Sequence, residues 1–388
     1  MIFSVFLPNS IVLSDYFQIL GFHALCYNGF MQKTLLEWYD AARRDLPWRH
    51  TRDPYAIWVS EIMLQQTRAE TVTGYWTRFL ARFPTVWALA GAPEQDVLKA
   101  WEGLGYYSRA RNLRRCAQVV CDIHAGEFPR TFEELKRLPG IGEYTAGAVA
   151  SIAFGVRVPA VDGNVERVVS RLKGIRQDVG APSVRRSLRA QAAALVPAER
   201  PGDFNQAMME LGARICQPAP RCADCPISNV CDAYEAGDAD GLPIKQRKAP
   251  QRILLRGVAL VFHENRVLLY QREEKLLQGL WCFPGFDHVE TGATVGKELE
   301  KLGVHARFIE EAGRCQHVFT HLVWDMTLLR FAADENACPE GWRWADKQML
   351  ASLPMPTAMK AAREIAEEEM KNARGRCPLD PRLRDSIP

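Results

Sequence analysis

The sequence predicts an all-α domain followed by a smaller α+β domain, and three observations support this fold class. Apolar residues recur at helical spacing from Met31 to about residue 235, without the alternating pattern of strands. The pattern changes at Ile253, where two runs rich in β-branched and aliphatic residues flank the turn His263–Arg266. Four cysteines are crowded into residues 216–231, near the end of the helical part. A chain of 388 residues is long enough for two domains.

The composition, 47% hydrophobic and 24% charged, is typical of a soluble globular protein, and a net charge of +3 does not by itself indicate nucleic-acid binding. Residues 1–30 are apolar but are interrupted by Pro8, Asn9 and Asp15. They therefore lack the uninterrupted apolar run of about 20 residues that a membrane span requires. They also lack the basic start and cleavage site of a secretory signal. We therefore expect an over-extended start or a disordered extension, no membrane contact, and a cytoplasmic protein.

The predicted elements follow in order. The first helix begins near Met31 and ends near Asp45–Pro47, a second begins at Pro54, and others cover about 71–82, 94–101 and 109–124. The all-α domain is thus expected over residues 31–235. Residues 236–252 have linker composition, with the basic residues Lys245, Arg247, Lys248 and Arg252. These charges predict a solvated tether, and phosphate contact is the alternative.

The second domain is expected over residues 253–372. A hairpin covers its first 20 residues, Trp281–Gly285 forms a strand end and turn, and a short helix spans 293–303. Further strands are expected over 304–332 and a last helix over about 357–372, before a tail at 373–388.

The stretch Leu138–Asn164 contains the first candidate site. The turn Gly140-Ile141-Gly142 precedes a helix, where unpaired N–H groups and the helix dipole favour a DNA phosphate. Small residues follow at 146–148, 150 and 151, which permits close helix packing. Asp162 then stands beside a flexible turn, as a helix cap or as a catalytic carboxylate.

The cysteines have the spacing Cys216-x5-Cys222-x2-Cys225-x5-Cys231. Four thiolates in so short a loop can hold one compact ion or cluster. Structural zinc sites usually pair two CxxC-like knuckles across a longer spacer, so this set favours a cubane iron–sulfur cluster, with zinc as the alternative.

Several motifs together resemble a known family. LPGIGxYTAGAV, VDGNVxRV, FNQAMMELGxxIC and the four-cysteine loop resemble the helix-hairpin-helix base-excision glycosylases that carry an iron–sulfur cluster. Within them, WVSEIMLQQTRAETV (58–72) and WEGLGYYSRARNL (101–113) resemble the adenine DNA glycosylases, the MutY family. CQHVFTHLVWDM (315–326) resembles that family's C-terminal, Nudix-like domain for oxidised guanine. The resemblance implies one [4Fe-4S] cluster, although the first cysteine arm is one residue shorter than is usual in the family.

The resemblance also implies a monomeric, nucleoid-associated enzyme of bacterial type that removes adenine opposite 8-oxoguanine or guanine in duplex DNA. Glu61 would be the general acid toward adenine N7 and then activate water, since its apolar helix would raise the carboxyl pKa. Without the resemblance, a glutamate in such a helix more often faces solvent. Asp162 would stay ionised and stabilise or trap the sugar cation, with Asn164 close to this centre. Tyr144 stands where endonuclease III-like relatives carry a nucleophilic lysine, which predicts a monofunctional glycosylase.

The base must leave the helical stack before it can be cleaved from the sugar. By resemblance, the residues that enter the stack and contact the oxidised guanine are Gln65, Gln66, Thr67, Leu104 and Tyr106, although Tyr106 could also be a core aromatic. The adenine pocket would comprise Trp48, Arg49, Leu64 and Gln206. A basic run predicts either phosphate contact or a solvated helix face, and it consists of Arg109, Arg111, Arg114 and Arg115.

In the second domain, Phe319, Thr320 and His321 correspond to the family's Phe-Ser-His loop. A Nudix hydrolase needs a glutamate cluster for magnesium, whereas Lys297 and Lys301 here replace acidic positions and Glu300 remains. We therefore expect a binding module without pyrophosphatase activity. Two other functions stay open from the sequence, namely a glycosylase for thymine or oxidised pyrimidines and a non-enzymatic damage sensor.

Overall fold

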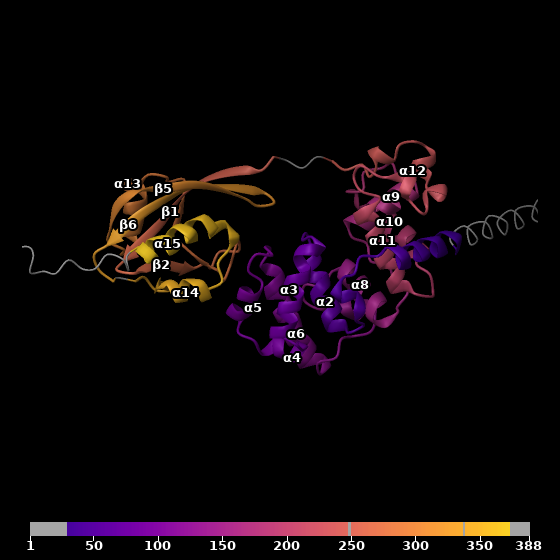
Figure 1. Ribbon diagram of the computed structural model, residues 1–388, viewed down its shortest axis with the longest axis horizontal. Coiled ribbons are helices and arrows are strands. Elements are labelled where there is room, and N and C mark those ends of the chain that lie inside the picture. Colours follow the sequence, from indigo (N-terminus) through magenta and orange to yellow (C-terminus); the bar gives the residue numbers. More distant parts are fainter. Residues whose placement is uncertain (1–28, 247–249, 337, 373–388) are drawn as a thin grey trace, which may run out of the picture. The chain divides into compact units, whose positions relative to one another are not determined.

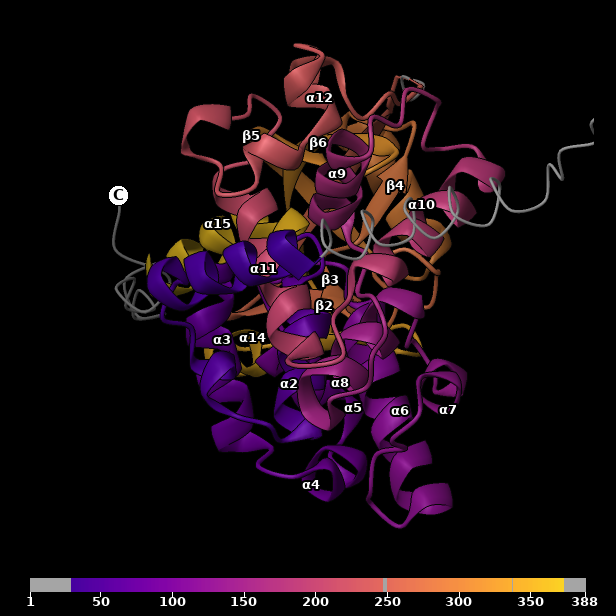
Figure 2. The same ribbon diagram turned by 90° about the vertical axis from the view of Figure 1, so that its right-hand side faces the viewer.

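The structure, a computed structural model, describes residues 29–246, 250–336 and 338–372. The predicted tail, nearly all of the N-terminal extension and part of the linker lie outside the described residues. The chain divides into two compact units, which Figures 1 and 2 show from two sides. The first contains the chain up to Trp87 together with Cys116–Arg247, and the second contains Ala88–Arg115 and the chain from Lys248 onward.

The first unit is helical, as predicted. A helix over residues 29–42 leads into the short helices and loops that frame the central pair α2 and α8. The helices are η1 (Pro47–His50), α2 (Pro54–Leu64), α3 (Ala69–Arg82), α4 (Val86–Gly91), α6 (Ser108–His124), α7 (Phe132–Arg137), α8 (Glu143–Phe154), α9 (Gly163–Leu172), α10 (Pro182–Leu195), α11 (Pro201–Arg214), η2 (Cys222–Asp224), η3 (Ser228–Val230), α12 (Asp232–Glu235) and η4 (Ala239–Gly241). Helices α4 and α6 continue into the second unit.

Local sequence signals fix the ends of the central helices. Asp53 caps α2 by accepting hydrogen bonds from the backbone N–H groups of Tyr55 and Ala56, and Pro54 occupies the first helical position. Helix α8 ends at Gly155, whose φ of 69° is left-handed. Both helices are buried along most of their length. A helix that is apolar on all sides belongs in the core, so α2 and α8 form the centre of this unit.

Glycines allow the elements around α8 to approach closely. A Cβ on Gly147 of α8 would lie 2.2 Å from the carbonyl oxygen of Pro159. On α11, a Cβ on Gly202 would lie 2.6 Å from the carbonyl oxygen of Ser151, and one on Gly212 would lie 2.7 Å from the Cβ of Asn164. These contacts confirm the expected role of small residues, and they bring α8, α9 and α11 together around one cavity.

The second unit is built on a mixed seven-stranded sheet with the order β3-β2-β1-β6-β5. Strand β1 pairs with β6 in parallel and with β2 and β4 antiparallel, while β7 pairs with β2. The strands are β1 (Arg252–His263), β2 (Arg266–Gln271), β3 (Trp281–Cys282), β4 (Gly285–Asp287), β5 (Ala306–Val318), β6 (Leu322–Ala333) and β7 (Trp342–Ala345).

Two hydrophobic cores lie on the opposite faces of this sheet. One contains residues of α14 (Lys347–Ser352), η5 (Thr357–Met359) and α15 (Lys360–Asn372). The other contains Val295 and Leu299 of α13 (Gly292–Lys301). Helix α5 (Glu94–Ala100) also belongs to this unit, since Gln95 accepts a hydrogen bond from Trp281 Nε1 at 3.2 Å. The result is an α+β domain, as the sequence predicts.

The predicted hairpin is confirmed, with His263 opposite Arg266 and Phe262 opposite Val267. The predicted helix over 293–303 corresponds to α13. Strand β7 and helix α14 were not predicted, because each is short and lacks a clear periodic pattern. Among the described residues, none of the helices is long and apolar enough to cross a membrane.

Replacing Gly147 with alanine should destabilise the first unit. The new methyl group would overlap the backbone of Pro159, which cannot move away like a side chain, and such overpacking costs about 1–3 kcal/mol. Urea unfolding followed by far-UV circular dichroism measures the loss. Gly241→Ala is the matched control, since nothing lies within 4 Å of its added Cβ. Unfolding curves of Gly147→Ala and the wild type that coincide would show that the close approach is absent.

Candidate active site

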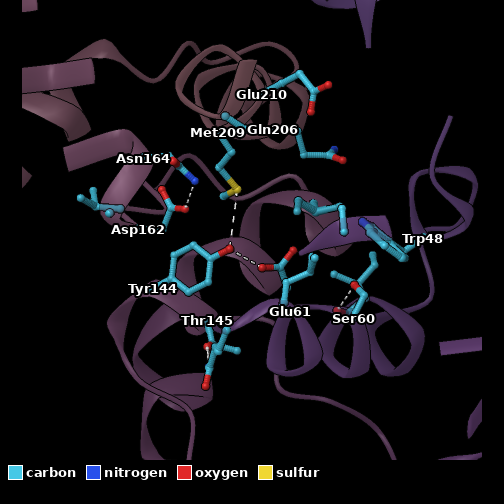
Figure 3. A pocket seen from close by; sticks show the side chains of 18 of the residues that line it. Trp48, Ser60, Glu61, Tyr144, Thr145, Asp162, Asn164, Gln206, Met209 and Glu210 are labelled. Atoms are coloured by element: carbon cyan, nitrogen blue, oxygen red, sulfur yellow. Dashed lines mark hydrogen bonds between the residues drawn. The ribbon is translucent and has the colours of Figure 1, made fainter. Parts of the chain in front are cut away.

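A cavity of about 1160 Å³ opens in the first unit between α2, α8 and α11. Figure 3 shows Glu61 and Tyr144 pointing toward one another in this cavity, with Asp162 and Asn164 on one side and Trp48 on the other. The structure therefore brings together most of the first-unit residues predicted from the sequence. The cavity is lined by Trp48, Arg49, Glu61, Leu64, Gln65, Gln66, Thr67, Gly142, Tyr144, Asp162, Asn164 and Gln206, among others.

Glu61 lies in the apolar environment that its helix predicts. Glu61 is only 4% exposed, which excludes the alternative of a solvent-facing position. Burial, assisted by the charge of Asp162, raises the carboxyl pKa to about 7, although a hydrogen bond from Tyr144 and the charge of Arg49 oppose the rise. The Tyr144 hydroxyl donates to Glu61 Oε2 at 2.5 Å. A carboxyl group with this pKa is protonated in a large fraction of molecules near neutral pH.

Asp162 caps helix α9, which confirms the interpretation of this residue as a helix cap, and it also lines the cavity. Its Oδ1 accepts from the backbone N–H of Val165 at 2.8 Å, and its Oδ2 accepts from the Asn164 side chain at 2.9 Å. Burial raises the pKa of Asp162, and these hydrogen bonds oppose the rise. Glu61 receives one hydrogen bond from a neutral phenol, whereas Asp162 also receives backbone donors and feels the positive charge of Arg167. Asp162 therefore has more groups that favour its ionised form than Glu61 has.

Glu210 is a buried charged residue of this site that the sequence did not reveal. Its side chain is fully buried, and both oxygens accept from the guanidinium of Arg44 at 2.9 Å, while Oε2 also accepts from Arg49 at 2.7 Å. Burial alone would raise the carboxyl pKa, but the two arginines outweigh it and lower the pKa to about 2. Glu210 thereby fixes Arg49, whose charge acts on Glu61. This role follows only from the contacts of Glu210 with Arg44 and Arg49, which lie more than 160 residues earlier in the sequence.

Other contacts fix the walls of the cavity. The indole of Trp48 meets the edge of Trp76, with ring centroids 6.2 Å apart. The Gln206 side chain donates to the backbone of its own helix at 3.4 Å, and Gln65 Nε2 lies at the same distance from Thr145 Oγ1. The sulfur of Met209, which was not predicted, lies 3.6 Å from the Tyr144 hydroxyl oxygen. A flat apolar wall with a few side-chain amides suits a planar heterocyclic base.

The predicted phosphate-binding turn lies between α7 and α8. Gly140 has a φ of 75° and is exposed, as is Gly142, whereas Ile141 is buried and anchors the turn. Glu143 begins α8, and its negative charge is offset by Lys136 at 3.2 Å and by Arg189. The turn thus exposes glycine backbone at the start of a helix, which suits an anion.

The remaining predicted residues lie in the second unit. Tyr106 is exposed and its hydroxyl oxygen lies 2.8 Å from Thr320 Oγ1, whereas Leu104 is buried. Thr320 and His321 are exposed in the turn between β5 and β6, and Phe319 packs edge-on against Trp324 with centroids 4.9 Å apart. The structure therefore brings Tyr106 and Thr320 together.

The basic run is not the uniform solvated face or phosphate-binding face considered from the sequence. Arg109 is only 9% exposed and donates to backbone carbonyl groups. Arg114 Nε donates to the carbonyl of Ala92 at 2.6 Å, and Arg111 donates to the carbonyl of Gln278 at 2.5 Å. Arg115 is the one exposed arginine of this run. Three of the four side chains therefore hold loops of the protein itself.

The four loop cysteines are half-buried, and their thiols are close enough to influence one another. Burial raises the pKa of the Cys225 thiol to about 12, and the other three thiols contribute to the rise. The buried guanidinium of Arg171 donates to Cys216 Sγ at 3.3 Å, and Arg167 donates to the Cys216 carbonyl at 2.7 Å. Four soft thiols with a cationic donor beside one sulfur suit an iron–sulfur cluster. Within the described residues, no group of three or more His, Cys, Asp or Glu is arranged to hold a single metal ion.

Comparisons with known proteins decide the family. Residues 59–193 match the model of the HhH-GPD superfamily of base excision DNA repair proteins, and residues 257–364 match that of the NUDIX domain. Adenine DNA glycosylase of Mus musculus is 34% identical over 88% of this chain and 79% of its own length. The enzyme of the same name from Buchnera aphidicola (strain APS) is 35% identical over 74% of this chain and 83% of its own length.

The chain belongs to the adenine DNA glycosylase family. It is an adenine-specific DNA N-glycosylase, so the prediction of an enzyme is confirmed and the non-enzymatic sensor is excluded. The human relative, 34% identical over 84% of this chain and 72% of its own length, agrees. The glycosylase combines a helix-hairpin-helix unit with a Nudix-like domain, as the resemblance implied.

Replacing Glu210 with glutamine should lower the stability of the glycosylase at neutral pH. Removing one partner of a buried ion pair leaves Arg49 uncompensated and costs roughly 3–5 kcal/mol. The folded-state pKa of about 2 lies below the ordinary value of 4.5, so the contribution of Glu210 is complete above about pH 4.5 and is lost as the pH falls toward 2. The difference in unfolding free energy between variant and wild type should therefore stay constant from about pH 8 to 5.

Glu70→Gln is the matched control for this measurement. Glu70 pairs with the same Arg44, but its side chain is 71% exposed, so its loss should change stability by less than about 1 kcal/mol. Equal effects of the two substitutions, or a Glu210 effect that disappears between pH 8 and 6, would contradict the buried ion pair.

Proposed function

We propose that the glycosylase hydrolyses the N-glycosidic bond of adenine paired with 8-oxoguanine or guanine in duplex DNA, with Glu61 and Asp162 as its catalytic residues. The observation that carries this proposal is the carboxyl pair in one cavity. Glu61 is buried with a pKa of about 7, and Asp162 is held by backbone and side-chain donors. One protonated and one ionised carboxyl group are what cleavage through an oxocarbenium-like state requires.

The proton of Glu61 is donated to N7 of the adenine, which turns the base into a neutral leaving group when the bond from C1′ to N9 breaks. The bonding electrons leave with the base, and the sugar becomes an oxocarbenium ion. The carboxylate of Asp162 stabilises this cation, or it forms a bond to C1′ that breaks again when water attacks C1′ and the carboxylate leaves. The Glu61 carboxylate then accepts a proton from the water that attacks C1′, which restores its starting state. Tyr144 orients Glu61 through its hydrogen bond.

Tyr144 also supports a monofunctional mechanism. A phenol has no amine nitrogen, so Tyr144 cannot form a Schiff base with the sugar. The product strand should therefore contain an abasic site and remain uncut.

Residues at the cavity edge of the first unit and, separately, residues of the second unit are proposed to contact the DNA around the opposite base. Gln65, Gln66 and Thr67 follow α2 at the edge of the cavity, and Gln66 has a left-handed φ of 58°. In the second unit, Tyr106 and Thr320 lie within hydrogen-bonding distance, next to Phe319 and His321 in the turn between β5 and β6. Aromatic rings and hydroxyl groups at the surface suit stacking on a base and hydrogen bonding to its edge.

The second unit is proposed to bind and not to hydrolyse. In α13, Lys301 pairs with Glu298 at 2.7 Å, and Lys297 and Glu300 are exposed. Two lysines in this segment oppose the accumulation of carboxylates that magnesium needs.

The four cysteines, Cys216, Cys222, Cys225 and Cys231, would hold one [4Fe-4S] cluster, and such a cluster would stabilise the loop that carries them. The chain's own residues prepare this loop, because Arg171 donates to the carbonyls of Gln217 and Pro218 at 2.6 and 2.8 Å as well as to Cys216.

The function is tested with three duplexes, which carry adenine opposite 8-oxoguanine, adenine opposite guanine, and thymine opposite guanine. We expect loss of adenine from the first two and no product from the third, with strand cleavage only after alkali treatment. Glu61→Gln should reduce single-turnover excision by at least about 10²-fold because the proton donor is gone, while duplex binding is retained.

Glu199→Gln removes an exposed carboxyl group from the same unit and should excise adenine like the wild type. Thymine release would support the alternative pyrimidine-directed enzyme. Full activity of Glu61→Gln, or a cut strand without alkali, would contradict the proposed mechanism.

The cluster is tested by metal analysis of the purified chain. We expect four irons per wild-type molecule and the visible absorption of an iron–sulfur centre, both lost in Cys225→Ser. Cys315→Ser changes a half-buried cysteine of strand β5, outside the loop, and should keep both signals. One zinc per chain and no iron would favour the alternative metal.

A further inference from the structure

The loop Gly103–Tyr106 has a backbone conformation that the chain does not adopt readily. Gly103 has a φ of 100°, Gly105 of 69° and Tyr106 of 47°. Glycine tolerates these values, but a left-handed tyrosine costs about 1–2 kcal/mol. Such a conformation persists only where its surroundings determine it.

Arg109 supplies these surroundings. Its Nη2 donates to the carbonyl oxygens of Leu104 at 2.8 Å and Gly105 at 3.2 Å, and its backbone N–H donates to the carbonyl of Tyr106 at 2.8 Å. One guanidinium therefore connects two successive peptide groups of the loop. Trp101 assists, since its Nε1 donates to the carbonyl of Gly105 at 3.1 Å.

The same guanidinium contacts two aromatic rings. Its central carbon lies 5.3 Å from the ring centroid of Trp101 and 5.6 Å from that of Tyr106. Burial lowers the pKa of Arg109 to about 10, so the side chain remains charged at neutral pH although it is taken out of water. A charge buried beneath an exposed loop is costly, and its contacts are directed at the carbonyl groups and rings of that loop.

Tyr106 is the exposed end of this arrangement. Its side chain is 48% exposed, while Leu104 and Arg109 on either side of it in the sequence are buried. An exposed aromatic ring on a fixed backbone loses little conformational entropy when a base stacks on it.

We propose that Arg109 is a positioning residue that holds Tyr106 ready to stack within the DNA when adenine is extruded. This inference rests on the proposed function. The positioning role requires arginine, because a lysine ammonium lacks the planar fork that can reach two carbonyl groups while facing two rings. The alternative, in which Arg109 contacts a DNA phosphate, predicts a different dependence of DNA binding on salt.

The test compares full-length wild type with Arg109→Lys, Tyr106→Ala and the double variant. Arg109→Lys keeps the charge but should lower the preference for duplexes with adenine opposite 8-oxoguanine over undamaged duplexes by roughly tenfold, as expected for loss of a charge-assisted hydrogen bond. In the double variant the loss should equal that of Tyr106→Ala alone, because both substitutions disable the same ring. Additive losses would overturn the proposal.

The dependence of binding on salt separates positioning from phosphate contact. Loss of one phosphate contact weakens binding to all duplexes alike and lowers the slope of log affinity against log salt by about 1. We expect Arg109→Gln to leave this slope unchanged and to lose selectivity. A slope lowered by about 1 with selectivity retained would show that Arg109 contacts phosphate. Arg115→Gln, which removes an exposed charge from the same helix, controls for net charge.

A measurement without DNA separates failure of this inference from failure of the proposed function. Amide hydrogen exchange over residues 103–106 should become at least about tenfold faster in Arg109→Lys and stay at the wild-type rate in Arg115→Gln. Unchanged exchange in Arg109→Lys would overturn the positioning role, even if adenine excision is normal. Wild-type protein without mismatch selectivity would refute the proposed function and leave the exchange result standing.

Discussion

The proposed active site depends on a carboxyl group that is kept out of water in a cavity of about 1160 Å³. Glu61 can be buried because α2 is apolar on nearly all sides and packs against α8. Its partner Tyr144 comes from α8, and Asp162 follows the loop that passes Gly147. Any loosening of these helices would admit water and return the pKa of Glu61 toward its ordinary value. Tight packing is thus a condition of the chemistry as well as of stability.

A second group of charged residues, Glu210 with Arg44 and Arg49, lines the same cavity. Glu210 is ionised and pairs with two arginines, whereas burial raises the pKa of Glu61 in the same cavity. The difference arises from donors, since Glu210 accepts charged hydrogen bonds on both oxygens and Glu61 accepts one from a phenol. The pKa values of two buried glutamates in one cavity are therefore shifted in opposite directions, and the charge of Arg49 acts on both.

Much of this was accessible from the sequence. The apolar helix around Glu61 predicted a raised pKa, and the small residues after Gly142 predicted close packing; both are found in the structure. Glu210 was not predicted, because one acidic residue on an amphipathic helix normally faces solvent and its partners are more than 160 residues away. Arg109 was interpreted as part of a basic run, since sequence cannot show that a positive φ at Tyr106 turns the loop carbonyls toward it. Roles that depend on long-range pairing or on backbone conformation need coordinates.

The two oxygens of Asp162 have separate partners, and this division has a consequence for the proposed mechanism. Oδ1 accepts the backbone N–H of Val165 that begins α9, while Oδ2 accepts the Asn164 amide. Asn164 in turn accepts from Arg167, which also binds the carbonyl of Cys216. When the sugar draws on one oxygen, the other can keep the end of the helix in place. In the proposed mechanism, Asp162 can thus exchange a partner without the cysteine loop losing its anchor on α9.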